Sequence, residues 1–250
     1  MAEIAGCEVL EYLSRNTYVV ERNGGKAVLK GIVALDSSEL AALEGLKGNP
    51  GVVNLEGLEQ VPLRMHENSP EYYLVLEYIE GQNIAQAFEQ KVMVFGEDAF
   101  REVIPDLARV VMGVHEDEYV LNDLKPPNVM LAPQGKKIVD LGSAFPVEQK
   151  YADAMATPGF LCLNHFDLIN HTSTDVFQLG VTGFFISEGR LPYRPDDIHN
   201  RRYLKLALSN GVPEMHGLKD KKMVDLVKAM LDPVDNNRPG IDEVVAILDA

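Results

Sequence analysis

The segment Leu121-Asn122-Asp123-Leu124-Lys125-Pro126-Pro127-Asn128 decides the fold of this chain, and Asp140-Leu141-Gly142 begins twelve residues after it. Its prolines restrict the backbone, so the carboxylate of Asp123, the ammonium group of Lys125 and the amide of Asn128 can converge on one point. Transfer of a phosphoryl group needs such a set: a carboxylate that holds the nucleophile, a cation for the developing charge and oxygen ligands for Mg²⁺. The two segments therefore indicate a phosphoryl-transfer site.

Before this segment the chain has the pattern of a small β-sheet. Asn23-Gly24 between two β-rich runs is typical of a hairpin, because that turn needs positive φ at both residues. Leucines at helical spacing predict a helix over 39–46, capped by Asp36-Ser37-Ser38. We expect five strands and this one helix to form the part of the chain over 1–79. Four of these strands are expected within residues 16–22, 26–32, 52–61 and 72–79.

After Gly81 the pattern becomes helical. Helices are expected over 99–115, 175–188, 224–231 and 241–248, with short strands at 128–131 and 137–139. The segment 175–188 is apolar nearly all round, which indicates full burial inside a larger helical lobe. We expect the ligand site between the two lobes, near the connector at 77–83.

Composition narrows the class of protein further. Hydrophobic residues make up 46% of the 250 residues, too many for a largely disordered chain. There are 23 Lys and Arg against 38 Asp and Glu, and the formal net charge of −15 argues against nucleic acid or an anionic membrane as a partner. With only Cys7 and Cys162, we expect no disulfide framework and a cytoplasmic location. No apolar run reaches the roughly 18 residues of a membrane span.

The segment 121–128 resembles the catalytic loop of eukaryotic-type protein kinases, His-Arg-Asp-Leu-Lys-Pro-x-Asn, and Asp140-Leu141-Gly142 resembles their Asp-Phe-Gly motif. Further segments resemble that family in the same order: 27–30 the lysine strand, 39–53 the αC helix and following turn, 73–81 the hinge, 156–160 the end of the activation segment, 175–181 the αF helix and 237–239 a late Arg-Pro element. The implied fold is α+β and bilobal, with a small antiparallel β-sheet N-lobe carrying one main helix over 1–79 and a larger, mostly α-helical C-lobe over 80–250.

The resemblance implies an ATP site between the lobes. Lys30 would contact the α- and β-phosphates and pair with Glu39, which holds it in place. The other ATP-binding residues that it implies are Val28 above the adenine, Met130 below it, Leu76 as gatekeeper, the backbone around Glu77 and Ile79, and Val19.

The resemblance also implies the chemistry. Asn128 and Asp140 would hold Mg²⁺, while Asp123 would orient a substrate hydroxyl and accept its proton. Lys125 would neutralise the γ-phosphoryl group, and in this family a Lys there together with Thr157 goes with Ser/Thr substrates. The implied function is a Ser/Thr protein kinase that transfers the γ-phosphate of ATP to a protein hydroxyl, with ATP and a protein as partners. Asp175 would brace the catalytic loop from below.

The chain departs from the family pattern at three places. Residues 12–19 lack the glycines of the glycine-rich loop. Leu121 and Asn122 replace the catalytic-loop His and Arg, so a phosphate on the activation segment has lost its usual partner and we expect activity that does not depend on one. Asn164 replaces the Glu that usually pairs with Arg238, and it can offer a hydrogen bond worth about 1 kcal/mol.

Two alternatives remain open at this point. One is a pseudokinase that serves as a nucleotide-binding or protein-interaction module, which the missing glycines and the altered His-Arg favour. The other is a small-molecule phosphotransferase on a related fold, which the Asp-Leu-Lys-Pro segment disfavours. Cys162 is interpreted as a packing residue, because no His or Asn context indicates a nucleophile.

Overall fold

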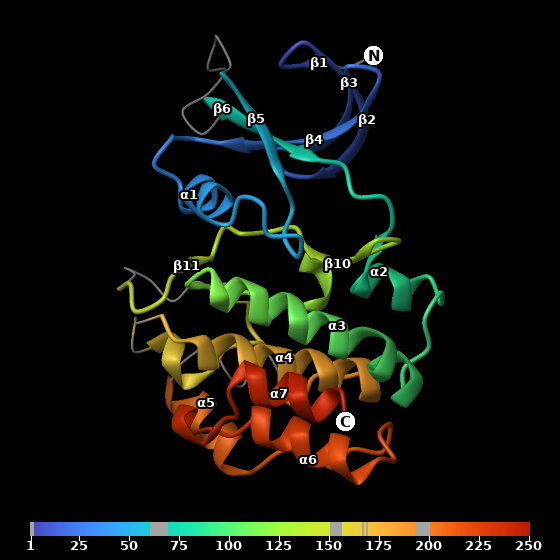
Figure 1. The fold of residues 1–250 in the computed structure, drawn as a ribbon, viewed down its shortest axis with the longest axis vertical. Coiled ribbons are helices and arrows are strands. Elements are labelled where there is room, and N and C mark those ends of the chain that lie inside the picture. Colours follow the sequence, from blue (N-terminus) through green and yellow to red (C-terminus); the bar gives the residue numbers. More distant parts are fainter. Residues whose placement is uncertain (1–2, 61–69, 151–156, 167, 169, 194–200) are drawn as a thin grey trace.

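The computed structural model describes residues 3–60, 70–150, 157–166, 168, 170–193 and 201–250, with no side-chain description for 201–203. Its first lobe is a curled antiparallel sheet of six strands in the order β1-β2-β3-β4-β6-β5, with one helix, α1, beside it (Figure 1). The strands are Glu3–Ile4 (β1), Cys7–Ser14 (β2), Thr17–Arg22 (β3), Gly25–Ile32 (β4), Leu55–Gln60 (β5) and Tyr72–Glu77 (β6), and α1 is Ser38–Gly45.

The predicted hairpin is confirmed. Strands β3 and β4 pair from Thr17↔Lys30 to Arg22↔Gly25, and the turn residues Asn23 and Gly24 have φ of 52° and 78°. Glycine and asparagine adopt this left-handed conformation more readily than other residues. The turn therefore sets the register that places Lys30 opposite Thr17.

The sheet has a different core on each face. Val19 pairs with Val28, and Val28 pairs with Leu76, so these three side chains lie in a row on one face, two residues along β4 from Lys30. The other face buries a separate small cluster, formed by Cys7, Val20, Ala27, Leu29, Tyr73 and Val75. The alternation of β4 thus sends Lys30 to the face that meets the second lobe.

Helix α1 begins where the sequence predicts. Ser37 is its N-cap, and the Ser37 side chain accepts a hydrogen bond from the amide of Leu40 at 3.3 Å. Leu40 and Leu43 are buried in the main core with Leu74 of the sheet. Glu39 lies in the first turn and is itself buried.

The second lobe is mainly helical (Figure 1). Its helices are Ile84–Glu89 (α2), Glu97–Glu116 (α3), Thr172–Glu188 (α4), Arg201–Ser209 (α5), Lys221–Met230 (α6) and Ile241–Leu248 (α7). Its short strands are Gln82–Asn83 (β7), Tyr119–Val120 (β8), Val129–Ala132 (β9), Gly135–Ile138 (β10) and Phe145–Pro146 (β11). As predicted, α4 is buried almost all round, and α3 and α6 pack against it.

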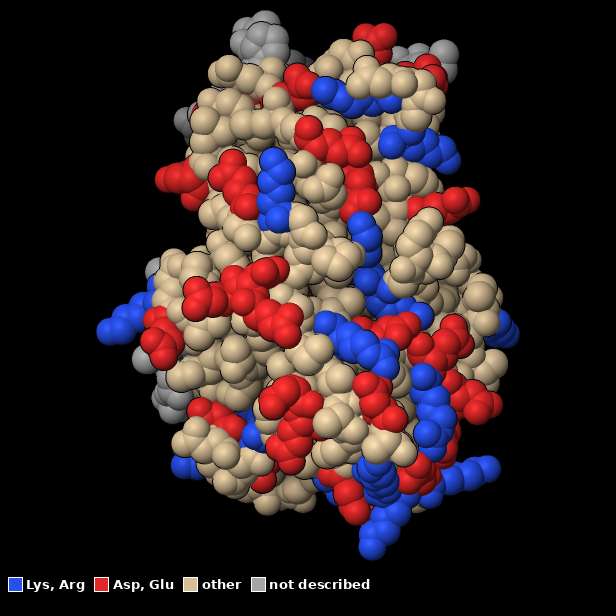
Figure 2. All heavy atoms as spheres, in the orientation of Figure 1, with Lys and Arg blue, Asp and Glu red and all other residues tan. Residues whose placement is uncertain are grey.

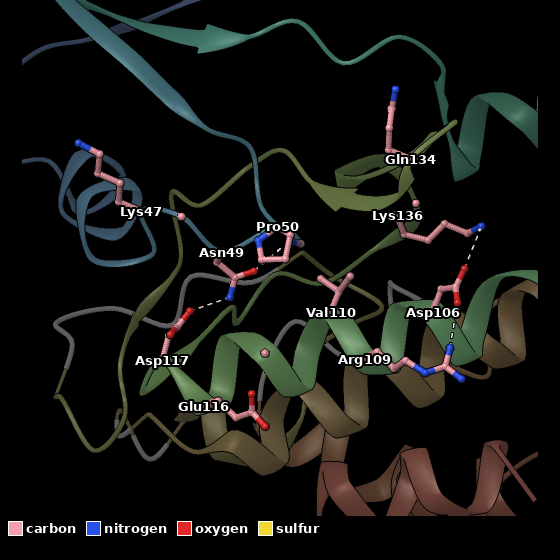
Figure 3. Close-up of a pocket in the computed structure, with 14 residues that line it drawn as sticks. Lys47, Asn49, Pro50, Asp106, Arg109, Val110, Glu116, Asp117, Gln134 and Lys136 are labelled. Carbon is pink, nitrogen blue, oxygen red and sulfur yellow. Dashed lines mark hydrogen bonds and ion pairs between the residues drawn. The ribbon is translucent and has the colours of Figure 1, made fainter.

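Hydrogen bonds hold the two lobes together behind the sheet. The amide of Val53 donates to the carbonyl of Ile138 at 2.8 Å, and the amide of Ile138 donates to the carbonyl of Gly51 at 2.9 Å. Asn49 Nδ2 donates to Asp117 Oδ2 at 2.7 Å, which ties the turn after α1 to the end of α3 (Figure 3). Helix α1 is therefore fixed relative to the second lobe from its C-terminal side.

The bilobal α+β architecture is confirmed, and the proposed division at 79/80 stays a prediction. The first sheet has six strands rather than the five expected. The sequence missed β1, β2, β7, β8, β11, α2 and α5, because these elements are short or expose much of their length. Val61, at the end of one expected strand, and Ala156, in one quoted motif, lie outside the described residues.

Figure 2 shows acidic side chains on both lobes with basic ones among them. Among the helices that the structure describes, none is both long and apolar enough to cross a membrane.

The packing around α4 yields a stability prediction. Phe177 is fully buried, and the guanidinium of Arg238 lies over its ring, 4.9 Å from the centroid. Phe177→Ala should lower the free energy of unfolding by about 3–5 kcal/mol, because it leaves a cavity and removes the cation–π contact. Urea denaturation measures the change. Phe177→Leu, which fills most of the space, should lose less, and equal losses for both variants would contradict this account.

Candidate active site

Lys30 lies between two carboxylates that come from different lobes. Its Nζ is 2.6 Å from Glu39 Oε1 on α1 and 3.0 Å from Asp140 Oδ1 in the second lobe. Burial lowers the pKa of Lys30, but the two carboxylates outweigh burial and hold this pKa above its ordinary value. Burial raises the pKa of Asp140, but Lys30 outweighs it and lowers that pKa overall. The predicted Lys30–Glu39 pair is thus formed, and it includes Asp140.

Burial also dominates the pKa of Glu39. It raises this pKa, and the attraction of Lys30 offsets only part of the increase. Asp140 adds to the increase by repulsion. A single ammonium group therefore compensates two carboxylates, which makes Lys30 the residue on which both depend.

Three of the four side chains expected to contact adenine lie on adjacent strands. Val19, Val28 and Leu76 form the row across β3, β4 and β6 described above. Met130 lies on β9 and is half-buried, where it pairs with Asn83 of β7. Val19, Val28 and Leu76 thus share one face of the first sheet, Met130 lies in the second lobe, and their contact with adenine stays a prediction.

The two hinge residues differ in their contacts. The Glu77 carboxylate forms an ion pair with Lys137 of β10 and accepts a hydrogen bond from the amide of Asn54 at 2.8 Å. Its own amide donates to the carbonyl of Asn54 at 3.0 Å. Ile79 is half-buried and packs against the main core. The side chain of Glu77 therefore connects its strand to Lys137 and to the backbone of Asn54, whether or not a ligand is bound.

Asp123 is the centre of a second cluster. Its Oδ2 is 2.6 Å from Lys125 Nζ, and its Oδ1 accepts from Thr157 Oγ1 at 2.8 Å and from the amide of Thr157 at 3.1 Å. Lys125 also donates to Thr157 Oγ1. Asn128 Nδ2 donates to the backbone carbonyl of Asp123 at 3.0 Å. The three polar groups that the sequence singled out do converge, and Thr157 joins them.

Asn128 and Asp140 fit a magnesium site by the chemistry of their donors. The Nδ2 of Asn128 is used by Asp123, so its Oδ1 remains as the acceptor end of the amide. Asp140 Oδ1 accepts from Lys30 and from the amide of Gly142 at 3.1 Å. Its side chain is 42% exposed, and among the described residues its Oδ2 makes no hydrogen bond. Hard oxygen ligands from one or two side chains, with waters and phosphates completing the shell, are what Mg²⁺ prefers.

Helix α4 holds the catalytic loop by its backbone. Asp175 accepts from the amides of Leu121 at 2.8 Å and Asn122 at 2.9 Å, which confirms its expected contact with the loop. Gln178, one turn later, accepts from the amide of Leu124 at 2.8 Å and donates to the carbonyl of Asn122. The Gln178 side chain therefore forms hydrogen bonds with the backbone on both sides of Asp123. Sequence reasoning missed it, because a lone glutamine does not reveal which backbone groups it will meet.

Two further contacts concern Cys162 and Arg238. Cys162 Sγ lies 3.3 Å from His165 Nδ1 and 3.5 Å from Asn164 Oδ1, so the statement that it has no His or Asn context was wrong. Burial raises the pKa of the thiol, but His165 outweighs burial and lowers it to about 7. The residue is fully buried, which agrees with a packing role.

Arg238 Nη1 donates to Asn164 Oδ1 at 3.2 Å, which is the hydrogen bond expected there.

The segment without glycines forms a tight turn. Strands β2 and β3 pair up to Ser14↔Thr17, so only Arg15 and Asn16 connect them. Asn16 has φ of 62°, and its carbonyl accepts from the amide of Gly31 at 2.7 Å. This turn is thereby anchored to the end of β4, next to Lys30.

A pocket of about 720 Å³ lies elsewhere, between the turn after α1, helix α3 and the β9–β10 turn (Figure 3). Asp106 pairs there with Arg109 at 2.9 Å and with Lys136 at 3.6 Å. None of the predicted site residues lines it. Its paired charges all lie in the second lobe and are separate from the candidate active site.

The Lys30 cluster predicts a pH-dependent effect of Lys30→Met on stability. The variant leaves two buried or half-buried carboxylates without a cation, and this penalty exists only while they are ionised. In the wild type, the lowered pKa of Asp140 contributes stability above the unfolded-state pKa, and this stability is lost as pH falls through the folded-state value. The loss in unfolding free energy on Lys30→Met should therefore be larger at pH 7 than at pH 4, as measured by urea denaturation.

Lys47→Met is the matched control, because Lys47 is exposed on the pocket of Figure 3. It should change stability little at either pH. An equal loss for Lys30→Met at both pH values would show that the carboxylates do not depend on Lys30.

Comparison with known proteins places the chain in a family. The profile of the protein kinase domain matches residues 34–247. Similar proteins include serine/threonine-protein kinase 17A of Oryctolagus cuniculus, 28% identical over 216 residues (82% of this chain, 52% of that protein). Serine/threonine-protein kinase PEPKR2 of Arabidopsis thaliana is 26% identical over 214 residues, 83% of this chain and 43% of that protein.

Ribosomal protein S6 kinase alpha-4 of Mus musculus is 30% identical over 170 residues, which is 62% of this chain and 20% of that protein. The chain thus spans about half the length, or less, of these curated relatives. The family match begins after the strand that carries Lys30, so residues 1–33, with Lys30 among them, lie outside it. The match still covers well over half of the sequence, and the chain belongs to the protein kinase domain family.

Proposed function

We propose that this chain is a Ser/Thr protein kinase that transfers the γ-phosphate of ATP to a protein hydroxyl with the help of Mg²⁺. One observation carries the proposal: Lys30 of the first lobe contacts Asp140 of the second at 3.0 Å, and Asp140 belongs to the same lobe as the cluster of Asp123, Lys125 and Asn128. The candidate site therefore contains a cation that can bind phosphates, oxygen ligands for a metal ion and a carboxylate that can accept the proton of a hydroxyl.

In the proposed site, Lys30 binds the α- and β-phosphates while Glu39 keeps it in position. Asn128 Oδ1 and Asp140 would hold Mg²⁺, which when bound neutralises phosphate charge. Val19, Val28, Leu76 and Met130 offer apolar surface to the adenine, and the backbone near Glu77 and Ile79 offers hydrogen bonds to its edge. The row of Val19, Val28 and Leu76 on three neighbouring strands supports this assignment, and Met130 would contribute from β9 of the second lobe.

The proposed transfer step uses Asp123 and Lys125. The substrate hydroxyl oxygen attacks the γ-phosphorus, its proton passes to Asp123, and the bond between the γ-phosphorus and the bridging oxygen breaks to release ADP. Lys125 stabilises negative charge on the transferred group. Its contact with Asp123 at 2.6 Å places it close enough to the carboxylate for both to serve one reaction.

The class of hydroxyl is assigned from the family resemblance, in which a Lys at 125 and a Thr at 157 accompany Ser/Thr substrates. The amide and Oγ1 of Thr157 both contact Asp123 Oδ1, so Thr157 lies directly beside the proposed base. Together with Lys125, this arrangement supports Ser or Thr as the acceptor rather than Tyr.

A second candidate function is a pseudokinase, and the turn at Arg15 and Asn16 is the observation that favours it. A glycine-rich loop lets backbone amides approach phosphates closely. Here two strands meet through a two-residue turn without glycine. Mg²⁺-dependent ATP binding without any transfer would support this second function and contradict the first.

The proposal predicts opposite defects for two isosteric variants. Asp123→Asn should retain Mg²⁺-dependent ATP binding but lower the transfer rate by about 10²-fold or more, because the proton acceptor is lost. Asp140→Asn should lose Mg²⁺-dependent binding itself. Thermal shift with ATP in the presence or absence of Mg²⁺ measures binding, and transfer to a generic basic protein measures activity. A wild-type transfer rate of Asp123→Asn would contradict the role assigned to Asp123.

We also expect activity that is independent of phosphorylation of the activation segment. Asn122 stands where the family has an arginine that pairs with a phosphate, and an amide is a poor partner for a dianion. Phosphatase treatment, with mass spectrometry to verify removal of phosphate, should leave the transfer rate unchanged. A rate that falls on dephosphorylation and recovers on rephosphorylation would refute this expectation.

A further inference from the structure

Two buried asparagines connect the catalytic loop to the segment after Asp140. Asn122 Nδ2 donates to Asn170 Oδ1 at 2.6 Å and to the carbonyl of Ser143 at 2.9 Å. Asn170 Nδ2 donates to the carbonyls of Phe145 at 2.7 Å and Pro146 at 2.8 Å. Asn122 is 3% exposed and Asn170 is fully buried. This asparagine pair therefore binds three carbonyls within four residues of chain.

The backbone around Asn170 adds to this attachment. The carbonyl of Asn170 accepts from the amide of Glu148 at 3.0 Å, and its amide donates to the carbonyl of Gln149 at 3.1 Å. Strand β11, which contains Phe145, pairs with β8 on another side. The chain from 143 to 149 is thus held by Asn122, by Asn170 and by β8.

The orientation of both amides follows from their neighbours. Two backbone carbonyls face one end of Asn170, and only an NH₂ group can donate to both, so Asn170 Oδ1 must face Asn122. Asn122 must then present its own NH₂ to Asn170 and Ser143. Its Oδ1 is buried and has no hydrogen-bond partner among the described residues. The amide keeps this orientation despite an unpaired oxygen, which shows that the NH₂ contacts dominate.

We propose that Asn170 is a positioning residue: acting through Asn122, it fixes the start of the activation segment against the catalytic loop without any phosphate. Asn122 immediately precedes Asp123, and Ser143 is three residues after Asp140. The pair therefore links the backbone beside the proposed base to the backbone beside the proposed metal ligand. The inference rests on the proposed kinase activity and deepens it.

An uncharged pair suits this buried position. A buried arginine would need an anion beside it, because an unpaired charge in the interior is costly. The NH₂ donors of neutral amides are satisfied by backbone carbonyls, which the chain always supplies. The contact is thus complete in the unmodified protein.

Asn170→Asp tests the proposal, because it keeps the shape and replaces the NH₂ donor by an oxygen facing two carbonyls. We expect kcat to fall by about tenfold or more while KM for ATP changes by less than about twofold, since misplaced catalytic groups slow the chemical step more than binding. Hydrogen–deuterium exchange should rise in residues 143–150 but not in α4. Asn210→Asp, the same change at an exposed position, should leave kcat and exchange at wild-type values.

Asn122→Gly gives a second approach to the same contact. Asn122 has φ of 61°, which glycine adopts without strain, so the variant removes only the side chain. Both single variants and the double variant form a cycle. If the two residues act as one unit, the double variant should lose no more kcat than the worse single variant, whereas independent, multiplicative losses would overturn the proposal.

The outcomes separate this inference from the proposed function. Wild-type kcat in Asn170→Asp would overturn the inference, and so would faster exchange throughout α4, which would show general destabilisation instead. If the wild type transfers no phosphate, the proposed function fails. The exchange data then decide the inference alone: a rise confined to 143–150 supports the asparagine pair as a tether, and no rise overturns it.

Discussion

The contact of Lys30 with Glu39 and Asp140 is the interaction on which the arrangement of the two lobes around the candidate site depends. Lys30 comes from a strand and Glu39 from a helix of the first lobe, and Asp140 comes from a loop of the second. Lys30 Nζ lies within 3.0 Å of one carboxylate oxygen of each acidic residue. Because one ammonium group compensates two carboxylates, moving α1 away would leave the buried carboxylate of Glu39 without a cation, and moving the loop away would do the same to the partly exposed carboxylate of Asp140. The pKa of Lys30 is raised and that of Asp140 is lowered, so both stay charged near neutral pH. Electrostatics thus couples the position of α1 to that of the proposed metal ligand.

Below this charged layer, the support for the catalytic loop is made from backbone hydrogen bonds. Asp175 and Gln178 of α4 bind amides and a carbonyl on both sides of Asp123. Helix α4 is buried almost all round, so its position is set by apolar packing rather than by solvent-exposed contacts. The side chain of Asp123 can therefore interact with Lys125 and Thr157 while its backbone is held from beneath.

Much of the site could be predicted from the sequence, because its residues sit in short segments with fixed spacing. Lys30, Asp123 and Asp140 were found in this way, and the Asn23-Gly24 turn was found from local backbone preference. Asn170 and Gln178 could not be, since their partners lie 20 to 60 residues away and a lone polar residue does not reveal which carbonyl it will meet. His165 beside Cys162 was missed because a spacing of three residues indicates contact only once the local backbone turns, and Leu163–Phe166 forms a 3₁₀ helix.

The use of charge also differs between the two parts of the site, and the difference has a physical reason. Groups that must meet phosphates have to be charged, and Lys30 and Asp140 remain partly exposed. Groups that donate to backbone carbonyls in the interior need no charge and would lose solvation energy by carrying one. The buried carboxylate of Asp175 has the other role, because it accepts from two backbone amides. Asn122, Asn170 and Gln178 are neutral and buried, in agreement with this division. An arginine at 122 would move a charge into the supporting layer and make the fold of this segment depend on an anion from outside. With asparagine there, the segment needs no such anion.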